Sequence, residues 1–320
     1  QNELGVSWSF AEDQGYNTPY NRMMMKKRGV VQEMLPYAQY LPQMPYVRES
    51  RRIVGVKTLV ADDLERGENA RHFQTSVAMG DYYMDLHHTY EALEFDLDRS
   101  DFTQDNGPFQ IPFEVFIPAE LDGFLPAEKN FSQSRLVSGA TRLQPVTMLT
   151  GQAVGTMASL AVSQGVQPRD LDPLRVQLEL LDEGSTLIQR WYADVPWNSE
   201  LWKAVQVLCL YRIMDRPGPI TSKNGMGFSA TENWGTDRPI SEKEAVDGIR
   251  KLALVLGYTL NDPTQDAFRG SSLTGARFYE LAGQISADLT RLVQIPWAGE
   301  AITQKDFALF SLKCIRKVYR

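Results

Sequence analysis

The chain has 320 residues, of which 43% are hydrophobic and 23% charged, a composition typical of a folded protein large enough for two domains. Its formal net charge of −7 argues against nucleic acid as the main partner, because phosphate binding requires clustered Lys and Arg. No apolar run approaches the roughly 20 residues that cross a bilayer, so the sequence predicts no membrane span.

Residues 46–120 alternate apolar and polar residues in short runs that Gly, Asp and Asn interrupt, a pattern typical of β-strands. The clearest candidates are RRIVGVKTLVA (51–61) and FQIPFEVFIP (109–118). Pro112 and Pro118 place the second candidate at a sheet edge or bend its ends, because proline donates no hydrogen bond to a ladder.

The most informative stretch runs from Gly123 to Ala161 and predicts a short apolar strand, a polar loop and then a helix. We expect this helix to open at Pro145, since proline is tolerated in a first turn. Gly151, Gly155 and Ser159 share one stripe, which would let the helix backbone approach a sheet or a ligand closely. The helix start would direct free N–H groups and partial positive charge at an electron-rich ligand.

After Gln164 the pattern is helical to the C-terminus. The polar run QGVQPRDLDP predicts a linker, and we therefore divide the chain into residues 1–165, a linker at 166–175 and a helical domain at 176–320. Two cysteines, Cys209 and Cys314, lie in apolar helical patterns, which predicts buried free thiols. No Cys/His spacing is typical of a metal site, so we expect none.

Three similar helix starts recur in the helical domain: ISEKEA (240–245), LTGARF (273–278) and ITQKDF (302–307). In each, a Ser or Thr can cap the first turn, and the preceding aliphatic residue can pack on the residue four beyond the cap. Ser241 with Glu244 also predicts a capping box. The segment at 228–246 resembles S-layer homology modules, which implies a cell-wall polysaccharide as partner and a periplasmic or secreted bacterial protein. The alternative is a helical bundle whose helices start well.

Four blocks occur in an order that resembles bacterial FAD-dependent oxidoreductases over roughly residues 1–165: YVRESRRIVG, SVAMGDYYMDLHH, FQIPFEVFIP, and LPAEKNFS followed by ATRLQPVTMLTGQAVGT. The resemblance implies an α+β or α/β fold. A substrate-side β-sheet and the closing strand and helix of a Rossmann-like FAD-binding fold would precede the α-helical C-terminal domain. The family's opening GxGxxG unit is absent, so we expect the C-terminal portion of a longer flavoprotein. Alone it would bind FAD poorly and be inactive, and the missing N-terminal FAD-binding segment would be its partner.

The resemblance also implies a flavin site at the helix start, made of seven residues: Arg142, Leu143, Gln144, Pro145, Val146, Thr147 and Gly151. Backbone N–H groups of Val146 and Thr147 would stabilise negative charge on the reduced ring. Arg142 would add a positive charge or hold a substrate carboxylate; the alternative for this residue is a surface or interdomain ion pair.

The candidate catalytic residues are Asp85, His87, His88 and Arg142. On a strand, Asp85 and His87 share one face and His88 lies on the other. One histidine would accept a proton from a substrate C–OH while a hydride moves to the flavin; the alternative is a polar pair at a sheet edge. The expected substrate is a polar small molecule, with carbohydrate-like compounds among the candidates. The rival function is a polysaccharide-binding module with a non-catalytic front half.

Overall fold

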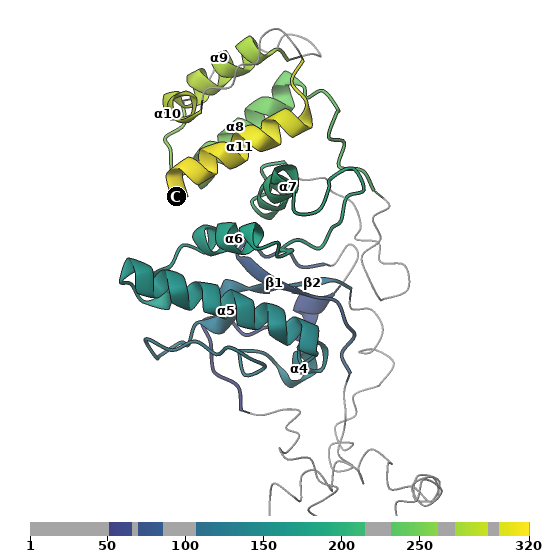
Figure 1. Cartoon of the computed structure of the whole chain (residues 1–320), viewed down its shortest axis with the longest axis vertical. Helices are drawn as coiled ribbons and strands as arrows, with labels where there is room; N and C mark the ends of the chain where they lie inside the picture. Colours follow the sequence, from purple (N-terminus) through teal and green to yellow (C-terminus); the bar gives the residue numbers. More distant parts are fainter. Residues whose placement is uncertain are drawn as a thin grey trace, which may run out of the picture. The chain divides into compact units, whose positions relative to one another are not determined.

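The structure is a computed structural model that describes residues 51–65, 70–85, 107–214, 232–261, 273–293 and 301–319 (Figure 1). All of these except Arg51 belong to one compact unit, formed by Arg52–Asp85 and Arg99–Arg320. Across the described ranges, none of the helices combines the length and apolar character that a bilayer crossing demands.

A small antiparallel sheet forms the centre of the first half. Strand β1 (Ser76–Gly80) pairs with β2 (Phe109–Pro112), with a bulge between Ser76 and Ala78, and every residue of both strands is buried. A Cβ on Gly80 would lie 2.4 Å from the ring of Phe109, its cross-strand partner. The ring can therefore pack over residue 80 only because this residue is glycine. The described part of the chain is therefore α+β, with two strands beside many helices.

The sequence overestimates the extent of this sheet. The expectation of one strand over 109–118 is wrong in its second half, because Phe113–Phe116 form a 3-10 helix, η5. Pro112 forms the last ladder pair with Ser76, and the N–H of Phe113 still donates to the carbonyl of Thr75 at 2.9 Å where the chain turns into η5. The segment 51–61 is extended but pairs through isolated bridges, Gly55 with Pro118 and Leu59 with Gln133, and short 3-10 helix η2 (Ala61–Leu64) follows.

The strand expected just after Gly123 is also wrong, since the described backbone between this glycine and Gln133 is irregular. A helix that the sequence reading missed, α4 (Arg135–Thr141), follows and is capped by Ser134. The closing strand of a Rossmann-like fold therefore does not appear where it was predicted.

Helix α5 (Gln144–Gln164) begins one residue before the predicted start and ends at Gly165, which adopts the left-handed conformation at φ 67°. It packs against β1 and against α6 (Pro173–Asp182), as Figure 1 shows. Its 21 residues include no charged side chain. Seven of them are buried: Val146, Thr150, Ala153, Val154, Met157, Leu160 and Ala161.

The small-residue stripe of α5 does not bring the helix close to the sheet, and the alternative of a close approach to a ligand stays a prediction. Gly155 and Ser159 are exposed, and a Cβ on Gly155 would meet nothing within 4 Å. A Cβ on Gly151 would meet the carbonyl oxygen of Ala127 at 3.4 Å, an ordinary contact. The sheet packs on the bulkier, opposite side of the helix because burying Val, Leu and Met removes more apolar surface from water.

The predicted linker, 166–175, contains a short 3-10 helix, η6 (Pro168–Asp170), and the first turn of α6. Asp172 caps α6, whose buried residues pack on α5 and β1. Apart from Arg51, the described residues of both predicted domains therefore lie within one compact unit, and the boundary between the domains stays a prediction.

The elements after α6 are helices: α7 (Glu200–Leu210), α8 (Glu242–Val255), α9 (Gly275–Ile285), α10 (Ala287–Leu292) and α11 (Gln304–Tyr319). Helix α7 packs against α11, and α9 packs against both α8 and α10 (Figure 1). We call α8 to α11 the tail. Cys209 and Cys314 are free and buried, as predicted.

All three predicted helix caps are confirmed. Ser241 and Glu244 form a capping box at α8, Thr274 accepts from the N–H of Arg277 at α9, and Thr303 accepts from the N–H of Asp306 at α11. The equivalent aliphatic residues that precede these caps also meet. Ile240 donates its N–H to the carbonyl of Ile302, which donates its own N–H to the carbonyl of Leu273.

A charged cluster joins α11 to the ends of α6 and α7. The guanidinium of Arg316 contacts both Asp182 and Glu200, and Lys203 lies 3.1 Å from Asp182 and 3.2 Å from Glu200. Burial opposes ionisation of Glu200, but Arg316 and Lys203 outweigh it and lower the pKa of this carboxyl. The cluster connects the tail to the part of the chain that contains α5.

Candidate functional site

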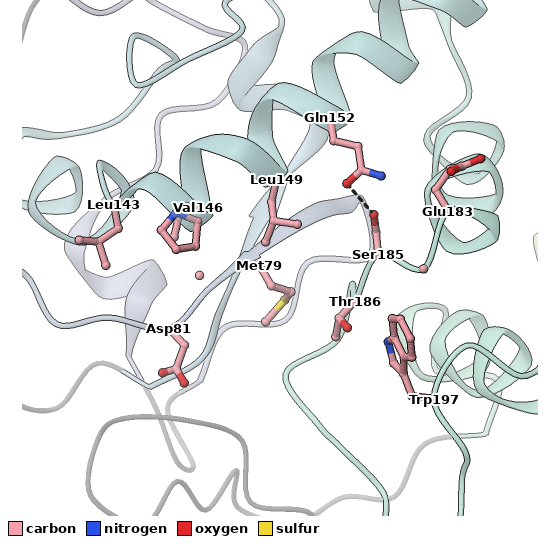
Figure 2. Close-up of a pocket in the computed structure, with 13 residues that line it drawn as sticks. Met79, Asp81, Leu143, Val146, Leu149, Gln152, Glu183, Ser185, Thr186 and Trp197 are labelled. Carbon is pink, nitrogen blue, oxygen red and sulfur yellow. Dashed lines mark hydrogen bonds between the residues drawn. The ribbon is translucent and has the colours of Figure 1, made fainter.

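A pocket of about 460 Å³ lies at the start of α5. Figure 2 shows its lining residues, which come from the end of β1, the first turns of α5 and the segment after α6. They are Met79, Gly80, Asp81, Leu143, Pro145, Val146, Leu149, Gln152, Glu183, Gly184, Ser185, Thr186 and Trp197. The volume falls within the roughly 300–1,000 Å³ that small-molecule sites occupy.

The first wall of the pocket, formed by Leu143, Pro145, Val146 and Leu149, presents the open start of α5. Leu143 is the N-cap residue and provides no side-chain acceptor for the first turn. The N–H of Thr147 already donates to the carbonyl of Leu143 at 2.9 Å, so it is used within the helix. The N–H groups of Gln144 and Val146 precede this bond and have no partner within the helix.

This open start differs from the other described helices of seven residues or more. Each of those has a side-chain acceptor at its start, provided by Ser134, Asp172, Ser199, Ser241, Thr274 and Thr303. Leucine ranks among the poorest N-cap residues, so the sequence here does not favour an isolated helix. The first turn of α5 is thus available to a group that accepts hydrogen bonds from within the pocket.

The end of β1 lines the floor of the pocket with Met79, Gly80 and Asp81. Directly after it, the rings of Tyr82 and Tyr83 stack with centroids 4.3 Å apart. The hydrogen bond with Tyr83, burial and the nearby Asp85 raise the pKa of Tyr82 to about 12, so this phenol stays protonated at neutral pH.

The second wall, formed by Glu183, Gly184, Ser185, Thr186 and Trp197, follows the end of α6. Gly184 has φ 82°, which reverses the chain at the end of the helix. The hydroxyl of Ser185 donates to the side-chain carbonyl of Gln152 on α5 at 3.2 Å, a contact drawn in Figure 2. Trp197 is 56% exposed and extends its ring at the edge of the pocket.

Arg142 directs its guanidinium toward Asp85. One Nη lies 2.5 Å from the backbone carbonyl of Asp85 and 3.9 Å from its carboxylate, and only 6% of the arginine side chain is exposed. A Cβ on Gly139 would lie 2.8 Å from the same carbonyl, so a glycine is needed for the Asp85 backbone to approach α4. Arg142 therefore forms a partly buried ion pair within one compact unit, which differs from the surface or interdomain pair expected as the alternative, and its role in the site stays a prediction. His87 and His88 lie outside the described residues.

The structure separates the seven expected flavin-binding residues into two groups. Leu143, Pro145 and Val146 line the pocket. Arg142, Gln144, Thr147 and Gly151 are not among its lining residues; the first contacts Asp85 and the last lies against Ala127. A helix exposes different sides at successive positions, so a run of consecutive residues cannot all face one cavity.

Sequence reasoning missed most of the second wall. The helix-stopping Glu-Gly-Ser run at 183–185 indicates a chain reversal after α6, and Trp197 forms an aromatic cluster in the sequence with Trp191, Tyr192 and Trp202. Neither signal shows proximity to α5. Of the other aromatic residues in this cluster, Tyr192 and Trp202 are buried in the core. The described ranges contain no group of three or more His, Cys, Asp or Glu residues that could hold a metal ion.

An α+β unit whose pocket opens at an uncapped helix start has the features of a protein that binds an electron-rich small molecule. The comparison with protein families identifies the class: residues 17–180 match the model of the FAD dependent oxidoreductase family, about half of the chain. The chain therefore belongs to this family; it is an oxidoreductase, and its cofactor is FAD. No curated protein and no solved structure matches the chain.

Proposed function

We propose that the pocket at the start of α5 holds the isoalloxazine ring of FAD and that the protein oxidises a polar small molecule there. The observation that carries this proposal is the coincidence of an uncapped helix start with a 460 Å³ pocket, and this helix start lies inside the range that the family model matches. FAD bound at this position would supply the acceptor for a hydride from the substrate.

The residues present fit a flavin ring. Met79, Leu143, Val146 and Leu149 give the pocket largely apolar walls, which suit the faces of a tricyclic aromatic system. The N–H of Val146, a lining residue without a partner inside the helix, suits its electron-rich edge, where negative charge increases on reduction. No Lys or Arg occurs among the described lining residues, so the pyrophosphate of FAD requires donors outside this pocket.

The roles of the chain's own groups follow from this arrangement. The first turn of α5 binds and orients the ring through N–H groups that the fold holds in place, which avoids reorganisation when charge develops. The apolar side chains exclude water and thereby strengthen these hydrogen bonds. Gln152 and Ser185 fix the opposite wall through their mutual hydrogen bond.

Proton transfer is the second part of the proposal. His87 or His88 would accept the substrate proton, as a histidine can near neutral pH. Arg142 would act as a positioning residue, because its hydrogen bond to the Asp85 carbonyl fixes the chain two residues before His87. Asp85 would contribute through this anchored backbone and through its ion pair with Arg142.

A matched pair of tryptophan substitutions tests the location of the ring. Leu149→Trp fills the pocket from its wall, whereas Met148→Trp adds the same volume one residue away at a side chain that is 75% exposed. We expect the first to weaken binding of lumiflavin, the isolated ring system, at least about tenfold, because a filled site excludes the ligand. The second should bind it as the unmodified chain does.

Flavin fluorescence titration gives the dissociation constants, and far-ultraviolet circular dichroism shows that both variants are folded. Equal affinity in the two variants, or no lumiflavin binding by the unmodified chain, would place the ring elsewhere. The polysaccharide-binding alternative depends on the resemblance of the tail's helix starts, and no contact among the described residues favours it over the flavin site.

A further inference from the structure

The second wall of the pocket belongs to the segment that joins α6 to α7. This segment, residues 183–199, contains Trp197 and all the other residues of that wall. It begins directly after Asp182, the last residue of α6, and ends directly before Glu200, the first residue of α7. The groups that hold the two ends of this segment therefore also set the position of the second wall.

One guanidinium connects both ends of the segment. Arg316 of α11 donates to the carboxylate of Asp182 at 2.7 Å and also to the carboxylate of Glu200. Lys203 of α7 lies 3.1 Å from the first carboxylate and 3.2 Å from the second. An acid at the C-terminal end of a helix is unfavourable by itself, because the helix dipole is negative there, so Asp182 depends on these cations. We call these four side chains the Arg316 cluster.

Helix α7 also holds the interior of the segment. The side-chain carbonyl of the buried Gln206 accepts hydrogen bonds from the N–H of Leu187 at 2.8 Å and from that of Ile188 at 3.2 Å. Trp202 meets Trp197 edge to face, with ring centroids 6.4 Å apart. A shift of α7 relative to α6 would therefore displace the second wall together with the ends of its segment.

We propose that Arg316 is a positioning residue for the pocket. It joins the end of α6 to the start of α7 and thereby holds the second wall against α5, which Ser185 contacts through Gln152. Arg316 is not a lining residue, so it acts through the two carboxylates. Only 21% of its side chain and 14% of that of Lys203 are exposed, so solvent screens these pairs less than pairs on the open surface.

The wall and its support lie beyond residue 180, where the family match ends. The second wall therefore depends on α11, a helix of the tail, rather than on the matched range alone. The effect on flavin binding rests on the proposed function, whereas the support of the wall by Arg316 can be measured without a ligand.

Hydrogen exchange of the full chain, measured by mass spectrometry, tests this support. Four N–H groups of the segment donate hydrogen bonds, those of Gly184, Ser185, Leu187 and Ile188. Such groups exchange when the structure around them opens. We expect Arg316→Met, which keeps an apolar stem without the charge, to raise their exchange rates about fivefold. The ladder N–H groups of β1 and β2 should keep their rates, because they report opening of the buried sheet.

Two further variants serve as controls. Arg316→Lys keeps the charge but loses the fork that reaches two carboxylates, so we expect a smaller increase of about twofold. Arg291→Met removes a charge from α10, where the arginine side chain is 79% exposed, and should leave the exchange of residues 184–188 unchanged. Unchanged exchange in Arg316→Met would overturn the proposal. Equal acceleration in β1 and β2 would also overturn it, because Arg316 would then support overall stability rather than the wall.

Titration of the same variants with lumiflavin measures the consequence for the site. We expect Arg316→Met to weaken lumiflavin binding about threefold, because a wall that opens more often is less preorganised, and Arg291→Met to leave it unchanged. Faster exchange with unchanged affinity would contradict the positioning role. If the unmodified chain does not bind lumiflavin, the flavin location is wrong, and the exchange rates alone still decide whether Arg316 holds the second wall.

Discussion

The starts of α8, α9 and α11 differ from the start of α5 in whether a side chain accepts hydrogen bonds from the unpaired N–H groups of the first turn. In α8, α9 and α11, Ser241, Thr274 and Thr303 accept hydrogen bonds from first-turn N–H groups. In α5, Leu143 occupies the capping position and accepts none through its side chain. Helices α8, α9 and α11 thus satisfy first-turn donors with their own cap residues, whereas the uncapped start of α5 lines a pocket.

The presence or absence of a side-chain cap changes the stability of a helix and the availability of its first-turn N–H groups to a ligand. A side-chain cap contributes about 1 kcal/mol, so an apolar residue at this position gives up that contribution. Because α5 also packs on β1 and α6, its stability comes from burial rather than from its ends. Such a helix can keep an open start, which is what a ligand with an electron-rich edge requires.

A pair of glycine substitutions gives the largest expected effect on this comparison. A Cβ on Gly248 of α8 would lie 2.6 Å from the buried ring of Phe307, while a Cβ on Gly155 of α5 meets open space. We expect Gly248→Ala to lower the free energy of unfolding by about 1–3 kcal/mol through overpacking. Gly155→Ala should raise it by about 0.5–1 kcal/mol, because alanine is the better helix former.

Chemical denaturation of both variants measures these changes. If Gly155→Ala is destabilising, the outer face of α5 is covered in solution. Both helices would then have a glycine at a position with no room for a methyl group. A neutral Gly248→Ala would instead show that α8 and α11 can separate enough to accept a methyl group.

The second test introduces a side-chain cap at the start of α5. Leu143→Asp and Leu143→Asn have nearly the same shape, and both can cap the free N–H groups. We expect lumiflavin affinity to fall about tenfold in the aspartate variant and less in the asparagine variant, because only the carboxylate repels an electron-rich edge. The aspartate variant should be at least as stable as the asparagine variant.

Fluorescence titration and thermal unfolding of the two variants are compared directly. If both bind lumiflavin as tightly as the unmodified chain, the donors at the start of α5 take no part in the site.

The smallest expected effect is a pH dependence of the stability that the capping box at the start of α8 contributes. Hydrogen bonds from Arg238 outweigh burial and, with Ser241, lower the pKa of Glu244 to about 2. Since the pKa is lowered in the folded state, the contribution of Glu244 is complete above about pH 4.5 and is lost as pH falls toward 2. The side chain is 40% exposed, so we expect only about 1 kcal/mol.

The difference in unfolding free energy between the unmodified chain and Glu244→Gln isolates this contribution. It should be about 1 kcal/mol at pH 7 and close to zero at pH 2. The corresponding difference for Glu120→Gln, an exposed acid, should not change with pH. A constant difference for Glu244→Gln would mean that its charge does not stabilise the capping box.

Local chemistry explains which parts of the fold were predictable. The caps at Ser241, Thr274 and Thr303 depend on residues within one turn, and the sequence located all three. The strand over 109–118 was predicted too long, because alternation continues past Pro112 while the chain turns into the 3-10 helix η5 at Phe113. The missed helix α4 consists of seven residues, too few for a clear helical period.

The site also combines features that the sequence predicts with features that depend on tertiary packing. The sequence itself determined the open start of α5, since an apolar residue before Gln-Pro provides no cap and the first-turn donors follow from helix geometry. Only the tertiary structure decided that Ser185, Thr186 and Trp197 line the pocket at this start, and that Arg142 contacts Asp85. Capping depends on neighbours within one turn, whereas a pocket wall depends on how separate elements pack, and no short-range pattern records that packing.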